Sequence, residues 1–523
     1  MKDMTRSLFV GWLVFAFLPA IAAPAEPMPI VPVASKDTKE GREAEAGSEE
    51  PFLSPYHGMK ISEALSELAV TLPTREITDP AYAAAKKAVL DALGCAMAGY
   101  DAPGVEIVVE QTKRFGGKPE ATIWFHGGKV PAPEATFANS VQTHALDLDD
   151  VHLPSVTHIT SVIVPAAFAA GEATGASGKE TLAAVIMGIE VAGRVGRAYS
   201  SRRAHGGFLP TSVVGGFGAS AAAARLRGLS PGQASHAMGV WYAHCSGNRQ
   251  ALLDRTLTKR IQPGIAARAG VFAAYLAERG VTGPNRIIGK QPAALLSIYG
   301  TRGEWNMVPM EEIMEPRDYY EVEQISYKRF ACCGASHPLL EGVLALVLEN
   351  DLKLDAVAEI DVYGVRGGLV GTPWRDAENP HVLAQFCAPY EVASVIKNRR
   401  FGPAEITRKR IAEDKEVDAL ARAVRFTGWD RWNGPELQET KGFQGVRIQL
   451  KDGRVLHAVR NRDHALRPDL MPWEKIVEKF TYNAVLSGLV DEAGAQQIVR
   501  AVERLDECKD VRQFIDKHLV FEK

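Results

Sequence analysis

A dense group of acids and imidazoles lies in residues 144–152 (HALDLDDVH), with His158 six residues further on. Three carboxyl and three imidazole groups within fifteen residues are unusual for a plain surface segment, because such groups repel one another or demand partners once buried. Two kinds of chemistry fit: a divalent metal site, or an acid/base site in which carboxylates orient imidazoles and shift their pKa. Capping and solvated loop residues are the third alternative, and spacing alone does not separate the three.

A second candidate group is basic. Arg255, Lys259 and Arg260 place three cations within six residues. Such a cluster can clamp carboxylates, since Arg offers two parallel hydrogen bonds and Lys a compact charge. A solvated charged face is the alternative that the spacing leaves open.

Two further segments invite chemical interpretations. In residues 327–338 (YKRFACCGASHP), His337 stands at a predicted helix start. Its imidazole is either functional, or it caps the helix or packs in the core. The adjacent cysteines could bridge only with strain, so a redox role is not favoured.

Residues 216–221 match G-x-G-x-x-A, but no full strand precedes them and the next acid is Asp254. A dinucleotide site needs both features, so these glycines predict close helix packing instead.

Composition limits the class of protein. The 523 residues are 46% hydrophobic and 24% charged, which is typical of a folded enzyme and excludes a disordered or fibrous chain. Lys+Arg 60 against Asp+Glu 63 gives a formal charge of −3, so there is no global electrostatic case for nucleic-acid binding. Six cysteines without a CxxC pair argue against a disulfide scaffold or a zinc finger.

The N-terminus predicts export. Residues 1–22 have the pattern of a signal peptide: Lys2 and Arg6 precede an apolar run that ends in the small-x-small triplet Ala20-Ile21-Ala22. The run is shorter than the roughly 20 residues that a bilayer span needs. Residues 23–54 lack hydrophobic periodicity and predict a disordered tether. We therefore expect a periplasmic or secreted protein with no membrane attachment after cleavage.

The rest of the chain predicts an α+β protein. Helix-start signals at Asp79-Pro80, Ser177 with Glu180, and Ser230-Pro231 precede apolar stripes rich in Ala and Gly. They indicate a large all-helical domain over residues 55–321, to which residues 468–523 return.

Residues 322–467 predict a smaller mixed α/β domain. Residues 358–363 alternate with period two, and residues 445–459 have the pattern of a hairpin that turns at Asp452-Gly453. A helix is predicted to begin near His337-Pro338.

Five ordered segments then carry a family resemblance: HALDLDDVHLPSVTH, SVIVPAAFAAGEATGASGKETLAAVIMGIEVAGRVG, TSVVGGFGASAAAARLRGLS, TKRIQPGIAARAGV and KRFACCGASHPLLEGV. They resemble the MmgE/PrpD family, which contains 2-methylcitrate dehydratase, cis-aconitate decarboxylase and an iminodisuccinate epimerase. The resemblance covers roughly residues 59–520. It implies a large helical domain and a smaller α/β lid domain with the active site between them, usually in a homodimer. It also implies chemistry without a metal or an organic cofactor.

The resemblance implies site residues as well. The expected catalytic residues are Asp147, His158, Lys259, His337 and Tyr390. Arg260 is expected to help Lys259 neutralise a substrate carboxylate, and His152 and His205 are further candidates for binding substrate.

The chain departs from the family pattern at three positions. Leu209 stands where family members carry a catalytic His, Val151 where Thr is usual, and Ile159 where Pro is common. Leucine cannot give or take a proton, so another group must do so. His205, four residues upstream, is a candidate for this compensation.

The expected function is that of a cofactor-independent lyase similar to 2-methylcitrate dehydratase, forming a carbanion beside a carboxylate of a small di- or tricarboxylate. A decarboxylase of cis-aconitate type and an epimerase are the alternatives within the family. An exported carboxylate-binding protein without activity is the alternative from another class, which Leu209 makes plausible. A metal-dependent hydrolase ranks third. Export favours a substrate that is met outside the cytoplasm.

Overall fold

The computed structural model describes residues 60–200, 207–288, 292–299, 313–314, 317–365, 379–437 and 440–521. Contacts separate Met1–Phe52 from a compact unit, Leu53–Lys523, and the description below concerns that second unit. The predicted signal peptide, the predicted tether and His205 lie outside the described residues. Within the described part of the chain, no helix combines the length and the apolar character that a membrane span requires.

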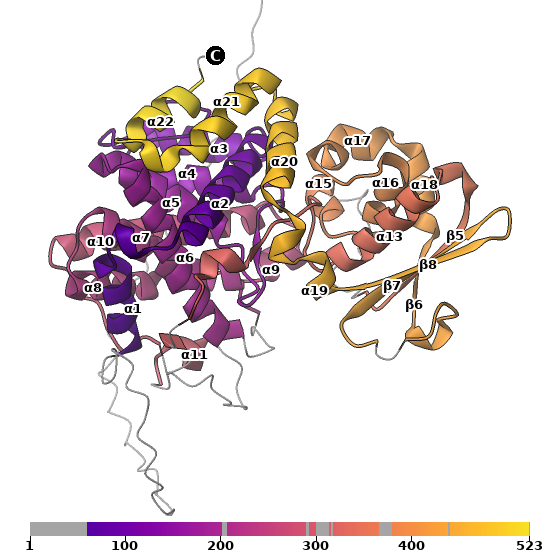
Figure 1. The fold of residues 1–523 in the computed structure, drawn as a ribbon, viewed down its shortest axis with the longest axis horizontal. Helices are drawn as coiled ribbons and strands as arrows, with labels where there is room; N and C mark the ends of the chain where they lie inside the picture. Colours follow the sequence, from indigo (N-terminus) through magenta and orange to yellow (C-terminus); the bar gives the residue numbers. More distant parts are fainter. Residues whose placement is uncertain are drawn as a thin grey trace, which may run out of the picture. The chain divides into compact units, whose positions relative to one another are not determined.

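Most of the described residues from 60 to 299, and from 473 to 518, are helical (Figure 1). The helices of this helical region are α1 (Ile61–Thr71), α2 (Asp79–Ala98), α3 (Val105–Phe115), α4 (Ala132–His144), α5 (Thr160–Thr174), α6 (Gly178–Ser200), α7 (Pro210–Leu226), α8 (Pro231–His244), α9 (Gln250–Leu253), α10 (Thr258–Glu278), α11 (Leu295–Ile298), α20 (Trp473–Leu486), α21 (Glu492–Glu503) and α22 (Val511–His518). Two short strands, β1 (Ala121–Thr122) and β2 (Lys129–Val130), pair antiparallel beside them.

Helix α7 lies at the centre of the helical region, and it is buried along almost its whole length. It packs against α5, α6, α8 and α10. A Cβ atom added at Gly218 would lie 2.4 Å from the carbonyl oxygen of Gly188 in α6, and one at Gly216 would lie 2.4 Å from the ring of Trp241. The glycines of the G-x-G-x-x-A match therefore serve close helix packing, as predicted.

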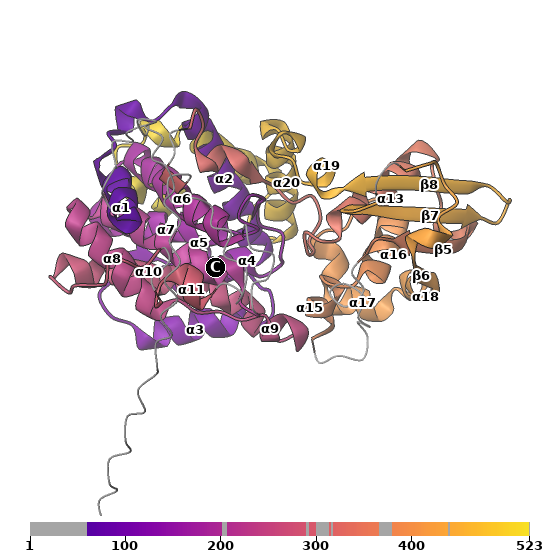
Figure 2. The ribbon, with the colours of Figure 1, turned by 90° about the horizontal axis from the view of Figure 1, so that it is seen from below.

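Residues 325–465 contain the principal sheet. Its strands are β5 (Val357–Tyr363), β6 (Val424–Thr427), β7 (Phe443–Leu450) and β8 (Val455–Asn461), in the order β6-β5-β7-β8. Strands β5 and β6 are parallel, and the other two pairs are antiparallel. The helices of this sheet region are α13 (His337–Glu349), α15 (Pro380–Ala384), α16 (Ala388–Asn398), α17 (Arg408–Glu413), α18 (Lys415–Ala423) and α19 (Arg462–Ala465). Figures 1 and 2 show α13 and α16 against one face of the sheet.

Local sequence signals account for several of these boundaries. The hairpin predicted at Asp452-Gly453 is confirmed: β7 and β8 pair as far as Gln449 opposite Val455, and Gly453 has φ of +89°. Ser230 caps α8 as predicted. The cap of α2 is Thr78 rather than Asp79, because the extended backbone at Thr78 brings its hydroxyl to the Ala81 N–H.

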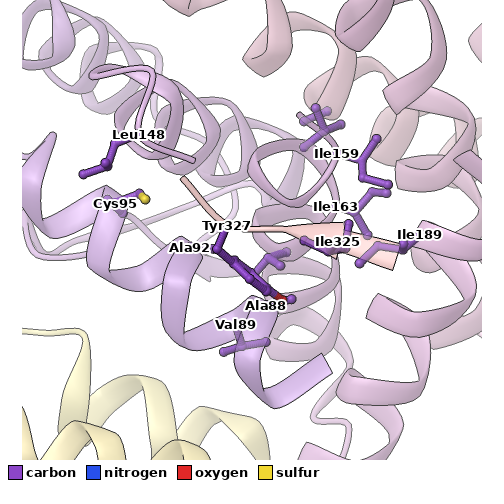
Figure 3. Close-up of a cluster of buried hydrophobic side chains, with 14 of the residues drawn as sticks. Ala88, Val89, Ala92, Cys95, Leu148, Ile159, Ile163, Ile189, Ile325 and Tyr327 are labelled. Atoms are coloured by element: carbon purple, nitrogen blue, oxygen red, sulfur yellow. The ribbon is translucent and has the colours of Figure 1, made fainter. Parts of the chain in front are cut away.

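A two-residue ladder links the acid-rich segment to the sheet region. Strand β3 (Val151–His152) pairs antiparallel with β4 (Ile325–Ser326), which is far along the chain. Behind this ladder lies an apolar core, in which Leu148 and Tyr327 gather with residues of α2 such as Ala92 (Figure 3). Leu148 follows Asp147 and Tyr327 precedes Lys328, so the core anchors the chain on both sides of the site described next.

The structure is thus helix-rich and mixed, with a small sheet, as the α+β prediction states. The predicted domain boundaries at residues 322 and 467 stay a prediction, since Leu53–Lys523 forms a single unit by contacts.

Candidate active site

The acid-rich segment folds as a tight loop between α4 and β3. Asp147 has φ of +52°, in the left-handed region that non-glycine residues rarely adopt. Its N–H donates to the carbonyl of His144 at 3.3 Å, and its own carbonyl accepts from Lys328 Nζ at 2.7 Å. A backbone held in this way directs the Asp147 carboxylate into the protein, where it is 2% exposed.

Two ammonium groups meet at that carboxylate. Asp147 Oδ1 accepts from Lys259 Nζ at 2.8 Å and from Lys328 Nζ at 3.0 Å. Lys259 is in the first turn of α10, and Lys328 follows β4. Burial raises the pKa of Asp147, but the charges of Lys259 and Lys328 outweigh burial and hold that pKa well below its usual range. Asp147 is therefore ionised, and the cluster of three groups carries a net positive charge.

A chain of hydrogen bonds continues from Lys259 to a second acid. Lys259 Nζ donates to His144 Nε2 at 2.9 Å, and His144 Nδ1 donates to Asp149 Oδ2 at 2.7 Å. Burial lowers the pKa of His144, and the nearby Lys259 lowers it further. His144 is thus a neutral imidazole with its proton on Nδ1, because Nε2 accepts from an ammonium.

Among the described residues, no hydrogen bond is formed by His158 Nε2, which lies beside this cluster. Its Nδ1 donates to the Asp150 carbonyl at 2.6 Å, which leaves the lone pair on Nε2, 3.9 Å from Asp147 Oδ1. Its side chain is 21% exposed, whereas those of His144 and Asp149 are closed off. Burial and the charge of Lys328 lower the pKa of His158 to about 3. His158 is therefore a neutral imidazole at neutral pH, and its Nε2 lone pair is open to a proton.

A hydrogen bond ties the first turn of α7, which follows Leu209, to His158. Leu209 is the residue before α7, and two residues later Thr211 Oγ1 accepts from the His158 N–H at 3.0 Å. The start of α7, where Leu209 stands, is thus tied to the His158 backbone, and the side chain at position 209 is apolar.

Asp150 has a structural task. Its Oδ1 accepts from the N–H of Thr160 at 3.1 Å, at the start of α5. Burial, and then the negative charge of Asp149, raise the pKa of Asp150 well above its usual value. The three acids therefore have different roles. Asp147 holds two lysines, Asp149 orients the His144 imidazole, and Asp150 caps the start of α5.

His337 begins α13, as predicted, and it is fully buried. Its ring packs edge-on against Phe330, with ring centroids 5.3 Å apart. Burial and the charge of Lys328 lower the pKa of His337 to about 3. Neither ring nitrogen has a hydrogen-bond partner of good geometry among the described residues, and the Phe330 backbone is near enough to raise the pKa of His337 slightly. The charge of Asp147 acts on this pKa in the opposite direction to that of Lys328, and no hydrogen bond or ion pair joins His337 to either group among the described residues.

The other predicted site residues that the structure describes form their hydrogen bonds with groups outside this cluster. Tyr390 is buried in α16, where its hydroxyl donates to the Glu405 carbonyl at 2.7 Å. His152 is held between Ser155 and Glu321, at 2.7 and 2.8 Å. Arg260 is buried beside Lys259, and its Nη1 donates to the Pro103 carbonyl at 2.9 Å. The structure thus joins Asp147, His158 and Lys259, and leaves Tyr390 and His152 with other partners.

A metal centre is the alternative that the spacing left open. His144, Asp147 and Asp149 each bring a possible ligand atom within 4.8 Å of the others. Those atoms already face Lys259, Lys328 or one another. A divalent ion there would stand beside two ammonium groups that repel it, so the donor set fits a hydrogen-bonded acid/base cluster better.

Sequence reasoning gave no role to Lys328, His144 and Asp149. Lys328 is a single lysine between Tyr327 and Arg329, and its approach to Asp147 depends on the β3–β4 ladder across 181 residues. His144 and Asp149 were part of the acid–imidazole segment, and only the fold distinguishes their roles from that of Asp150.

Comparison with known families identifies the chain. The MmgE/PrpD N-terminal domain matches residues 63–304, and the MmgE/PrpD C-terminal domain matches residues 330–507. The chain belongs to the MmgE/PrpD family.

Curated relatives carry the name cis-aconitate decarboxylase. That of Aspergillus terreus is 25% identical over 473 residues, which is 87% of this chain and 95% of that protein. The cis-aconitate decarboxylase-like protein oryM of Aspergillus oryzae is 26% identical over 82% of this chain and 91% of its own length. The human enzyme is 27% identical over 55% of this chain and 57% of its own length. These similarities support a lyase-like function at the level of the family.

Proposed function

We propose that this protein is a cofactor-independent lyase that decarboxylates a small unsaturated polycarboxylate of the cis-aconitate type. The observation that carries the proposal is the pair of ammonium groups, Lys259 and Lys328, on one buried carboxylate beside the free Nε2 of His158. The names of the relatives support the class of substrate.

The chemistry needs a place for negative charge. When the bond to the departing carboxylate breaks, its electron pair forms a new carbon–carbon double bond. The pair of the old double bond then moves to the carbon beside a second carboxylate, as an aci-carboxylate. One CO2 leaves and one proton is taken up at that carbon. Preorganised cations stabilise such charge most strongly where water is excluded, and Lys259 and Lys328 supply two of them.

His158 is the proton carrier in this proposal. It is neutral in the unliganded protein, but the negative charges of a bound polycarboxylate favour the imidazolium. The proton then passes from Nε2 to carbon. The Asp150 carbonyl holds Nδ1 in place, so the ring keeps its orientation in both protonation states. The sheet region, acting as the predicted lid domain, would exclude water during the step.

Dehydration of a 2-methylcitrate-like substrate is the second candidate. The lone pair on His158 Nε2 favours it, because dehydration begins with removal of a proton from carbon. The leaving hydroxyl would also need an acid, and Leu209, the residue before α7, cannot be one. Decarboxylation has no leaving hydroxyl, so the apolar side chain of Leu209 obstructs it less.

The test follows cis-aconitate and 2-methylcitrate in D2O by NMR, with the wild-type protein and its Lys259→Met variant. We expect loss of CO2 from cis-aconitate with one deuterium bound to carbon in the product, and a fall of at least 100-fold in the variant, on the order of one lost transition-state contact. Lys353→Met, at an exposed lysine, is the control and should keep full activity.

Two other results would reject the proposal. Turnover of 2-methylcitrate with release of water, and none of cis-aconitate, would establish the dehydratase instead. Loss of all turnover after EDTA treatment, with recovery on adding Zn²⁺ or Mn²⁺, would establish a metal enzyme.

A further inference from the structure

Two buried polar side chains, those of His381 and Gln385, carry nitrogen atoms that have no hydrogen-bond partner among the described residues. His381 is in α15 and is 4% exposed, and Gln385, at the end of that helix, is 2% exposed. Both ring nitrogens of His381 and the Nε2 of Gln385 lack a hydrogen bond to any described group. Buried polar atoms are nearly always hydrogen-bonded, so an orphaned set of this kind points to a missing ligand.

A buried cation lies next to them. Arg260 is 3% exposed and donates from Nη1 to the Pro103 carbonyl. No carboxylate of the described chain lies within ion-pair distance of its guanidinium. Arg260 is close enough to His381 for its charge to lower the pKa of that imidazole, which burial lowers most, to about 4. A buried guanidinium without an ion-pair partner is costly, and an anion would relieve the cost.

The chain geometry connects this set to the active site. His381 and Gln385 are four residues apart, so they lie on one face of their helical turn. The next residue, Phe386, has its ring centroid 5.5 Å from Lys259 Nζ. The Gln385 carbonyl accepts from the N–H of Cys333 at 2.9 Å, which ties the segment to the chain that follows Lys328. The segment therefore lies between the elements that carry the two active-site lysines.

We propose that Arg260, His381 and Gln385 form a carboxylate-binding subsite that holds a carboxylate of the substrate remote from the reacting carbon. The guanidinium offers two parallel N–H groups, the imidazole one, and the amide one or two, which matches the oxygens of a carboxylate. The subsite makes the protein selective for tricarboxylates over shorter dicarboxylates. This inference rests on the proposed function only in taking the ligand to be a polycarboxylate.

The test measures binding rather than turnover. Isothermal titration calorimetry would compare tricarballylate, which has no double bond to react, with succinate, which lacks one carboxylate arm. We expect His381→Phe to weaken tricarballylate binding at least tenfold and succinate binding less than threefold. Gln385→Leu should act in the same direction. His381→Asn, which keeps a donor, should recover part of the loss, and this separates lost hydrogen bonding from poor folding.

Each result has a definite meaning. His457→Phe, in β8, is the control and should change neither dissociation constant. If the wild-type protein prefers tricarballylate and His381→Phe keeps that preference, the subsite is refuted while the proposed lyase stands. If the preference is lost in the variant but cis-aconitate is not turned over, the subsite stands and the lyase proposal fails. Absence of tricarballylate binding to the wild-type protein would overturn the subsite, and turnover of cis-aconitate would then decide the lyase proposal by itself.

Discussion

The buried carboxylate of Asp147 shows what can and cannot be predicted at the scale of single residues. The density of acids and imidazoles in residues 144–158 indicated acid/base chemistry, and the resemblance pointed to Asp147, His158 and Lys259, which the structure places together. The same density also made His152 a candidate for binding substrate, but its hydrogen-bond partner is Glu321, 169 residues away. Partners of this kind arise only from tertiary structure.

Glu391 gives a residue-scale prediction. It is fully buried in α16, and its Oε1 accepts from the N–H of Cys387 at 3.2 Å. Burial raises its pKa from 4.5 to about 8, to which the negative charge of Asp147 adds. The folded protein thus binds this proton more tightly than the unfolded chain, so its stability falls as pH rises from about 4.5 to about 8.

The variant Glu391→Gln removes that dependence. Its free energy of unfolding should exceed that of the wild type by an amount that grows with pH, by at most about 1.4 kcal/mol per unit, and levels off above pH 8. Urea unfolding at pH 5, 6.5 and 8 measures the difference. Glu349→Gln, at an exposed acid, should show none of it. Parallel pH curves for Glu391→Gln and wild type would contradict the prediction.

At the scale of elements, strong local signals succeeded and short tertiary pairings were missed. The Asp-Gly turn and the Ser230 cap were predictable because each involves residues adjacent in sequence. The β3–β4 ladder was not, since a two-residue strand has no periodicity to detect. Yet this ladder carries Lys328 to Asp147.

The contact between α6 and α7 gives an element-scale prediction. Gly218→Ala would force α6 and α7 apart, because its Cβ would lie 2.4 Å from the Gly188 carbonyl oxygen, and should cost about 1–3 kcal/mol. Thermal unfolding measures this as a lower Tm. Gly232→Ala is the matched control: it is in α8 with nothing within 4 Å of the added Cβ, so its Tm should hold or rise slightly. Equal Tm values for both variants would show that α6 and α7 separate freely.

At the scale of the whole molecule, one lysine joins distant parts of the chain. Lys479 in α20 pairs with the buried Asp91 of α2 at 2.6 Å, and it donates to the Leu148 carbonyl at 2.9 Å. It thus ties a C-terminal helix to an N-terminal helix and to the residue that follows Asp147. Nothing in the local sequence distinguishes Lys479 from Lys475, which is one turn earlier and exposed.

Lys479→Met should therefore lower both stability and activity. Removing the ammonium leaves Asp91 buried without its partner, which costs about 3–5 kcal/mol. It also releases the loop that carries Asp147, so kcat on cis-aconitate should fall even at temperatures where the variant is folded. Urea unfolding and steady-state kinetics check the two effects. Lys475→Met should alter neither, and a Lys479→Met protein with wild-type stability would refute the role of the pair.

The return of the chain to the helical region after the sheet has a consequence for synthesis. Phe480 of α20 packs against Gly94 of α2, and the Phe125 N–H donates to the carbonyl of Leu519, almost the last residue described. While the ribosome is still making the sheet region, the part of α2 that α20 covers in the complete protein is exposed. The nascent chain must keep that face from aggregating until its final helices emerge, so an incomplete chain that ends before α20 is exposed to chaperones and proteases rather than active.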